Sequence, residues 1–239
     1  MNQDGIRLNK FLASCGAGSR RACDALIQEG GVTLNGEACT NPATRVSPDD
    51  VIRLRGKRVS PRQTTTILFK KPRGYVCSKQ DELGRATIYE LLPPKLQHLN
   101  HVGRLDRDSE GLLVLSNDGD LANKLTHPRN KVEKEYRVTL STAPDTRDLK
   151  KLLEGVRTPE GRARAKSFKR LSPRRLSLVL ETGLKRQIRE MFTTLGYQVE
   201  KLFRIRIGRL TDPDLPTGRW RYLEHHEIEL LSLDPGERT

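Results

Sequence analysis

The sequence lacks several features that mark whole classes of protein. Its longest uninterrupted apolar run, residues 112–115, is far shorter than the roughly 20 apolar residues that a membrane-spanning helix needs. The apolar segment of a secretory signal peptide is also missing near the N-terminus. The cysteines are few and too irregularly spaced for a zinc knuckle, so we expect them to be reduced thiols of a cytoplasmic protein: Cys15, Cys23, Cys39 and Cys77.

Common catalytic patterns are absent as well. The chain has no Ser-His-Asp order, no glycine-rich loop of the kind that cradles phosphate, and no histidine motif with metal-ligand spacing. These absences disfavour a serine hydrolase, a nucleotide-phosphate enzyme and a metal enzyme.

What the chain has in excess is positive charge. Its 239 residues include 44 Lys and Arg against 30 Asp and Glu, which gives a formal net charge of +14. Such a balance is typical of proteins that bind polyanions, so RNA, DNA or an anionic surface is the expected partner. Because single domains cluster at roughly 100 to 150 residues, the length favours two domains.

The first 60 residues are predicted to form a small module of two helices and a sheet. The first helix follows from the helical spacing of Leu8, Phe11 and Leu12. Ser19 is placed to cap a second helix, for which the spacing gives the apolar positions Ala22, Ala25 and Leu26. Residues 32–34 precede Asn-Gly, a strong hairpin signal. We predict domains at 1–60 and 67–235, joined by a basic linker at 61–66.

The second domain is predicted to be α+β. Strand and helix patterns alternate there without a regular βαβ rhythm, which favours a largely antiparallel sheet. Strands are expected at 67–69, 112–115, 136–140, 176–180 and 199–207, and helices at 120–125, 149–155 and 188–195.

Asp106 is the first candidate for chemistry. It lies between Arg104 and Arg107, just before the apolar run, and neighbouring cations favour the ionised carboxylate. An aspartate can serve as a nucleophile, a general base or a metal ligand. The metal role is disfavoured because the nearest carboxylates, Asp108 and Glu110, lack a recognisable ligand spacing. The alternative that Asp106 only caps a turn or pairs with a neighbouring arginine stays open.

Two further segments combine positive charge with a structural pattern. In residues 181–191, Arg186 and Arg189 lie one turn apart where a helix begins, a position at which cations are unfavourable unless an anion compensates. The alternative is a merely soluble helix face. Tyr136 lies on a strand beside Lys134 and Arg137 and could stack on a base, although a single strand tyrosine can equally be a core residue.

Taken in order, four segments resemble the RsuA family of bacterial ribosomal-RNA pseudouridine synthases: Lys71-Pro72 with Gly74, then residues 103–106, 134–136 and 183–191. The first 60 residues resemble the small S-four-like RNA-binding module that precedes the catalytic domain in this family. The resemblance covers essentially the whole chain. It implies a catalytic domain with a mainly antiparallel, bent central sheet flanked by helices.

The resemblance also implies roles for individual residues. Asp106 is the expected catalytic aspartate, Tyr136 stacks on the target uracil, and Arg189 pairs with the aspartate. Arg104 supports the catalytic loop. Glu190 departs from the family, which usually has a second arginine there. The other residues implied to line the pocket, build the first motif or contact RNA are Ile188, Leu202, Lys71, Pro72, Arg7, Lys10, Arg20, Arg21 and Arg186.

The implied function is the isomerisation of a flipped-out uridine to pseudouridine in ribosomal RNA, with the large subunit favoured over the small. The reaction has no redox change or net hydrolysis, so no cofactor is expected. The aspartate can attack the anomeric carbon of the ribose, remove a ribose proton or attack the uracil ring, and sequence leaves all three open. The partner is ribosomal RNA or a subunit assembly intermediate, and the protein is expected to be a monomer without membrane contact. The alternatives are a catalytically silent RNA-binding assembly protein and, less favoured, a metal-dependent nuclease.

Overall fold

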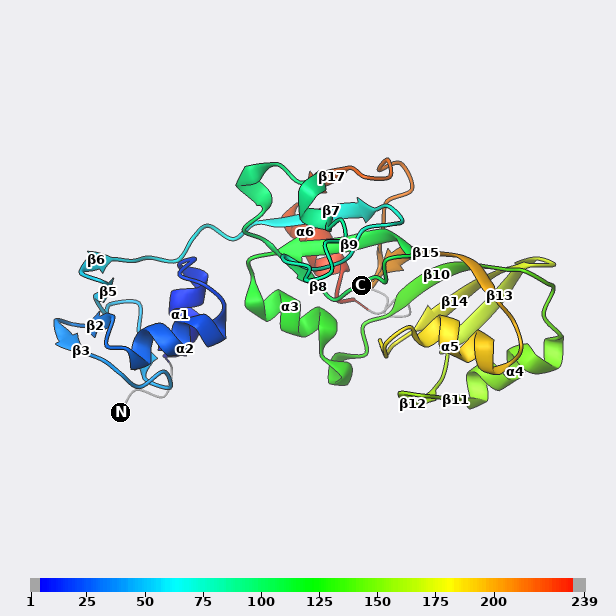
Figure 1. Cartoon of the computed structure of the whole chain (residues 1–239), viewed down its shortest axis with the longest axis horizontal. Coiled ribbons are helices and arrows are strands. Elements are labelled where there is room, and N and C mark those ends of the chain that lie inside the picture. The colour runs from blue at the N-terminus through cyan, green and yellow to red at the C-terminus, as the bar shows by residue number, and fades with distance from the viewer. Residues whose placement is uncertain (1–4, 234–239) are drawn as a thin grey trace. The chain divides into compact units, whose positions relative to one another are not determined.

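The computed structural model describes residues 5–233, which form two compact units (Figure 1). The N-terminal unit contains residues up to Thr64 together with Asn117–Gly119, and the C-terminal unit contains the rest. The outermost parts of the two predicted domains, residues 1–4 and 234–235, lie outside the described residues. Among the residues described, no helix is long and apolar enough to cross a membrane.

The N-terminal unit has the two helices and the small sheet that its sequence predicts. The Ser19 hydroxyl accepts a hydrogen bond of 3.1 Å from the backbone N–H of Ala22 and so caps the second helix. Asn35 and Gly36 both have positive φ angles, 52° and 95°, as a tight two-residue hairpin turn requires. The elements are β1 (Ile6–Arg7), α1 (Leu8–Ser14), α2 (Arg20–Gln28), β2 (Val32–Leu34), β3 (Glu37–Ala38), β4 (Arg45–Val46), β5 (Ile52–Leu54) and β6 (Lys57–Arg58).

The buried face of α2 differs from the predicted one. Ala22 and Ala25 are exposed, whereas Cys23 and Ile27 are fully buried. These two residues are four apart and therefore lie on one face. They pack against Leu8 and other residues of the unit's core. The prediction was wrong because the small alanines matched the helical period but have little apolar surface to bury.

The C-terminal unit is built on a nine-stranded sheet whose main path is β13-β14-β10-β15-β9-β7-β17, with β8 beside β9 and β16 beside β15. Every pairing in the sheet is antiparallel except the short parallel contact of β15 with β9. The α+β prediction is therefore confirmed. The strands are β7 (Thr66–Lys71), β8 (Asn100–Val102), β9 (Glu110–Ser116), β10 (Lys134–Leu140), β13 (Ser167–Ser172), β14 (Arg175–Leu180), β15 (Val199–Ile207), β16 (Leu210–Thr211) and β17 (Trp220–Tyr222).

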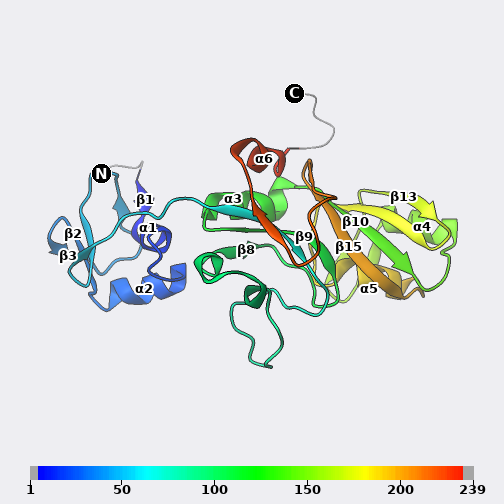
Figure 2. The same cartoon turned by 90° about the horizontal axis from the view of Figure 1, so that it is seen from above.

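Helices cover both parts of this sheet, and the predicted helices are found. One core cluster joins α4 and α5 to β10, β14 and β15, and another joins α3 and α6 to β7 and β9. Figure 2 shows α3 and α6 on one side of β9 and the segment before β8 on the other. The remaining elements are η1 (Ile88–Leu91), η2 (Pro94–Leu96), α3 (Gly119–Thr126), η3 (Pro128–Asn130), α4 (Thr146–Glu154), β11 (Val156–Thr158), β12 (Gly161–Ala163), α5 (Gln187–Thr194) and α6 (His225–Leu230).

Strand β9 is buried on both faces, which explains its uninterrupted apolar run. Leu112 and Val114 pack into the cluster with α3 and α6, whereas Leu113 and Leu115 pack into the cluster with η1 and η2. Side chains of a strand alternate between faces, so a strand covered on both sides has no polar position.

Gly111 makes the parallel contact between β9 and β15 possible. It has φ of +111°, and a Cβ atom built there would lie 2.2 Å from the carbonyl oxygen of Arg204. Only glycine tolerates both conditions. The close approach joins the two parts of the sheet immediately after the loop that carries Asp106.

Candidate functional site

The candidate site is built on the loop of residues 103–109, which connects β8 to β9. Its first residue, Gly103, has a positive φ of 72°. Within the loop, the Ser109 N–H donates to the Asp106 carbonyl over 3.1 Å. The Gly74 N–H donates to the Arg107 carbonyl over 2.7 Å. The loop is therefore held both by its own backbone and by the segment that follows β7.

Lys71 fixes this loop from the protein interior. Its side chain is fully buried, and its ammonium donates to the carbonyls of Pro72, Asp106 and Ser109 over 3.0, 3.0 and 2.8 Å. Burial lowers the pKa of Lys71, although nearby carboxylates oppose that effect. A mainly structural role, which the resemblance implies for the first motif, fits these contacts of Lys71, whereas direct contact with RNA does not, because its ammonium is directed at loop carbonyls and is closed off from solvent.

Asp106 lines a cavity of about 700 Å³, a volume within the usual range for small-ligand sites. Of the residues implied by the resemblance, Arg104, Tyr136, Arg186, Ile188 and Leu202 line the same cavity. The structure therefore brings together residues from four separate parts of the sequence around one carboxylate.

The environment of Asp106 differs from the one expected. Burial raises the pKa of Asp106, and the charge of Arg186 is the largest effect that opposes it. The adjacent Arg104 and Arg107 are both exposed. Burial therefore has a larger effect on the pKa of Asp106 than the nearby cations, which were expected to dominate.

The ion pair expected between Arg189 and Asp106 is replaced by one with Asp108. The Arg189 Nε atom lies 3.1 Å from Oδ2 of Asp108, and Nη2 donates to the Asp108 carbonyl over 2.9 Å. Arg186 Nη1 lies 3.2 Å from the other carboxylate oxygen, Oδ1. Burial alone would raise the pKa of Asp108, but the two arginines hold it below its ordinary value.

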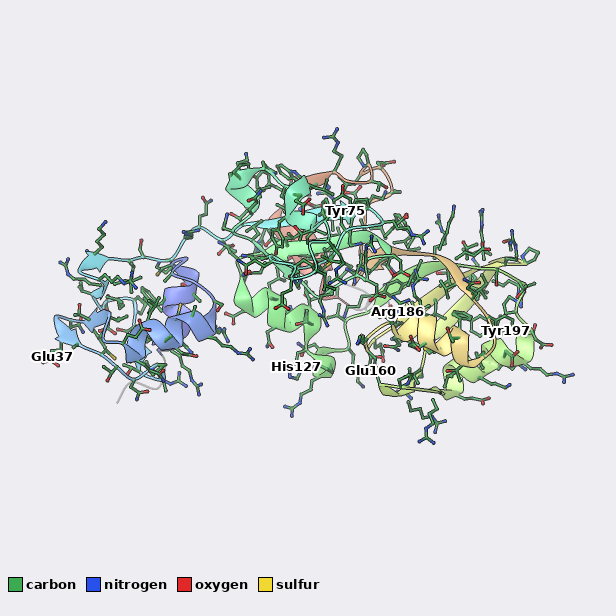
Figure 3. All side chains as sticks on the ribbon, in the orientation of Figure 1. Glu37, Tyr75, His127, Glu160, Arg186 and Tyr197 are labelled. Carbon is green, nitrogen blue, oxygen red and sulfur yellow. The ribbon has the colours of Figure 1, made fainter. Side chains whose placement is uncertain are left out.

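The start of α5 aims both arginines at Asp108. Arg186 occupies the N-cap position with a left-handed backbone, φ 51°, and Arg189 follows in the first turn. Arg189 also donates from Nη1 to the Val199 carbonyl over 2.8 Å, which ties α5 to β15. Glu190 is 3.9 Å from the Arg186 guanidinium and partly offsets its charge. Figure 3 shows Arg186 at the beginning of α5 and Tyr197 beyond its end.

Tyr136 shares its side of the cavity with two basic residues, Lys134, which the sequence already places beside it, and Arg204, which sequence reasoning did not select for the site. Arg204, directly opposite Tyr136 in the β10 and β15 register, places its guanidinium carbon 6.0 Å from the ring centroid. Its Nε donates to the Leu112 carbonyl over 2.6 Å. Lys134 donates to the Leu125 carbonyl over 3.0 Å, and burial lowers its pKa to about 8. The available signal for Arg204 was its period-2 spacing from Leu202, which puts both on one strand face.

Asp108 was also missed as a site residue. It entered the sequence argument only as a poor metal ligand, yet it is the residue that connects the loop to α5. Arg7, Arg20 and Arg21 are exposed on the N-terminal unit, and Lys10 is partly buried there. Their proposed contact with RNA stays a prediction.

Comparison with known proteins agrees with this geometry. A family model described as RNA pseudouridylate synthase matches residues 65–194, and a model described as S4 domain matches residues 6–52. The ribosomal large subunit pseudouridine synthase B of Bacillus subtilis (strain 168) is 36% identical over 231 residues, which cover 94% of this chain and 95% of the relative. The chain belongs to the RNA pseudouridylate synthase family.

Other pseudouridine synthases align over similar lengths. The ribosomal large subunit pseudouridine synthase B of Escherichia coli (strain K12) is 34% identical over 246 residues, covering 96% of this chain and 84% of the relative. A crystal structure titled as a pseudouridylate synthase superposes with a TM-score of 0.70 at 30% identity and covers 95% of this chain and 99% of its own.

As a pseudouridine synthase, the protein is an isomerase that acts on RNA, and its N-terminal unit is an S4 domain. The recognition made from the four motifs is confirmed. Within residues 5–233, no cluster of three or more His, Cys, Asp or Glu side chains could hold a metal ion. The expectations of a monomer and of a cofactor-free reaction stay predictions.

Proposed function

We propose that this pseudouridine synthase converts a uridine of large-subunit ribosomal RNA into pseudouridine, with Asp106 as the reactive carboxylate. The site assignment rests on the burial of the Asp106 side chain and on the lack of a bonding partner for its carboxylate. Asp106 is partly buried at a cavity, and its carboxylate makes no hydrogen bond or ion pair with any residue in the described part of the chain, although its backbone carbonyl is bonded to Lys71 and Ser109. An unused carboxylate in a ligand-sized cavity is available to the substrate.

The choice of the large subunit rests on the relatives. The proteins of Bacillus subtilis and Escherichia coli described above carry that substrate in their names and align with nearly the whole chain. The expected substrate is the RNA itself or a subunit assembly intermediate. Exposed Arg7, Arg20 and Arg21 of the S4 domain, together with Lys10, would contact its phosphates.

The cavity offers a defined role to each group around a flipped-out uridine. Tyr136 would stack on the uracil, while Ile188 and Leu202 supply apolar walls. The bond from the ribose anomeric carbon to the ring nitrogen breaks, the uracil turns, and a bond forms from the same carbon to carbon five. The proton on carbon five is lost, and the freed ring nitrogen gains one, so the reaction is balanced without a co-reactant.

Asp106 would drive this exchange by attacking the anomeric carbon, by taking a ribose proton or by attacking the uracil ring. The attacking or proton-accepting carboxylate must be ionised. Arg186, which opposes the effect of burial on the pKa of Asp106, would keep that form populated. Arg189 would act indirectly: it binds Asp108 and so holds the loop that carries Asp106 in place.

The test is to map pseudouridines in ribosomal RNA from cells with and without the gene. We expect pseudouridine to disappear from large-subunit RNA, to return with the wild-type gene, and to stay absent with Asp106→Asn. The matched control is Asp214→Asn, which changes an exposed aspartate of the same unit and should restore the modification. Loss confined to small-subunit RNA would refute the subunit assignment, and restoration by Asp106→Asn would refute the site. An unchanged map would favour the silent RNA-binding alternative.

A further inference from the structure

A second cavity, of about 580 Å³, lies on the Asp108 side of the same loop. Asp108 lines it together with three arginines, Arg73, Arg186 and Arg189. Thr193 and Gln198 add neutral polar groups. Arg186 lines this cavity and the cavity of Asp106 alike. The Arg186 side chain therefore borders both cavities.

The charges in the second cavity do not balance. Asp108 offsets one of the three guanidinium groups, which leaves a formal excess of two positive charges among these four residues. Arg73 is exposed, and its side chain makes no hydrogen bond or ion pair with another described residue. Burial and the neighbouring charges of Arg186 and Arg73 all lower the pKa of Arg189, although Asp108 opposes them. Gathering like charges is unfavourable, so an anion bound here would be stabilised.

Asp108 gives the cavity a fixed shape. By holding Arg186 and Arg189 through its two oxygens, it orients both guanidinium planes while leaving Arg73 uncommitted. Guanidinium groups with fixed orientation bind phosphate oxygens in pairs more effectively than flexible ammonium groups do.

We propose that this cavity binds a backbone phosphodiester of the RNA strand next to the target uridine. The inference rests on the proposed uridine site at Asp106. Asp106 and Asp108 are two residues apart, a span of at most about 7 Å, so a strand that places its uridine in the first cavity brings adjacent phosphates to the second. The contact would fix the register of the strand without reading a base.

Arg73→Gln tests the proposal, with Arg219→Gln as the matched control. Arg219 is an exposed arginine of the same unit that lines neither cavity. The probe is a synthetic stem-loop centred on the uridine that the mapping experiment identifies, and its affinity is measured over a range of salt concentrations. For Arg73→Gln we expect affinity to fall about 5- to 10-fold and the slope of log affinity against log salt to become shallower by about 0.7 to 0.9. The rate at saturating RNA should fall less than the affinity, and Arg219→Gln should match the wild type.

A second measurement locates the phosphate. Uncharged methylphosphonate linkages are introduced one at a time around the uridine. One linkage should weaken binding to the wild type and have a clearly smaller effect on Arg73→Gln, in which Arg186 and Arg189 remain. An unchanged salt slope for Arg73→Gln would overturn the proposal. So would losses of affinity that add to that of Arg73→Gln at every methylphosphonate linkage, or a fall in the reaction rate of Arg73→Gln without a fall in its affinity. Absence of pseudouridine in the stem-loop treated with wild-type enzyme would count against the proposed function, whereas the binding data would still test the cavity.

Discussion

Asp106 and Asp108 are two residues apart on one loop, yet their surroundings give them opposite properties. Asp106 faces the larger cavity without a partner, and burial raises its pKa. Asp108 faces the smaller cavity between two arginines, and its pKa is lowered. The comparison teaches that reactivity here depends on which carboxylate the arginines of α5 reach. One acid is held in place, and the other is left available for substrate.

The largest expected effect is that of Asp106→Asn on turnover. Asparagine keeps the shape of the side chain but can neither attack carbon nor accept a proton, so activity should fall on the order of 10⁴-fold or more. Release of tritium from carbon five of labelled uridine in RNA measures it. The variant should be folded and at least as stable as the wild type at neutral pH, because the folded state disfavours ionised Asp106. Substantial turnover by a clean preparation of Asp106→Asn would show that Asp106 is not the reactive carboxylate of the pair.

Removal of the buried ammonium below the loop should have the next largest effect. Lys71→Met removes the ammonium that donates to the carbonyls of Pro72, Asp106 and Ser109, and the Asp106 carbonyl then keeps only the Ser109 N–H as its donor. We expect the free energy of unfolding to fall by about 2–4 kcal/mol and turnover to fall about 100-fold, because buried acceptors lose their partner and the loop loses its position. Urea denaturation and tritium release measure the two effects.

Lys70→Met is the matched control for this variant. Lys70 is also largely buried, but its ammonium donates to the Pro213 carbonyl rather than to the loop. It should be destabilised without a comparable loss of turnover by the folded fraction. If Lys71→Met and Lys70→Met lost turnover equally, the hydrogen bonds of Lys71 to the loop would not be what positions it for catalysis.

Asp108→Asn should have a smaller effect on turnover and an effect on stability opposite in sign to that of Asp106→Asn. Loss of the ion pairs with Arg186 and Arg189 should reduce the free energy of unfolding by about 1–2 kcal/mol at neutral pH and turnover by about tenfold. Because the folded state lowers the pKa of Asp108, its stabilising contribution is present above the unfolded pKa and is lost as pH falls through the folded one. Urea denaturation at several pH values measures the effect. If Asp106→Asn and Asp108→Asn changed the free energy of unfolding in the same direction, the prediction would be wrong.

The smallest expected effect is a displacement of the acid limb of the pH profile. Activity should rise with pH as Asp106 ionises, and its raised pKa places that limb above the range of an ordinary aspartate. In Asp108→Asn the like charge is gone and the two arginines are released, so the pKa of Asp106 should fall and the limb should move to lower pH. The profile of single-turnover rates measures the shift, and a limb that stayed in place would show that Asp108 has no electrostatic influence on Asp106.

Sequence was sufficient where short-range pattern decides the outcome. The Ser19 cap, the Asn35-Gly36 turn and the strand at 112–115 were all predicted correctly, because each follows from neighbouring residues. The helical period failed for α2, where it selected Ala22 and Ala25 although the fold buries Cys23 and Ile27.

The sequence predicted which residues line the site, but not which of them form ion pairs with one another. The four motifs selected residues that do line one cavity, including Asp106, Tyr136 and Ile188. They did not show that Arg189 would meet Asp108, which is 81 positions away along the chain. That contact depends on where the first turn of α5 falls relative to β9, a matter of tertiary packing. Arg204 was missed for the same reason, since its role follows from strand register with Tyr136.

Gly111 has a consequence for how substitutions in this enzyme should be interpreted. Any side chain there would collide with the backbone of Arg204, and Arg204 is the residue that lies against the Tyr136 ring. Separation of the two strands would therefore displace Arg204 from the Tyr136 ring and also disturb the buried Leu112 beside Gly111. Variants at this position are expected to lose stability and activity together, so a loss of activity there would not by itself identify Gly111 as a residue that touches RNA.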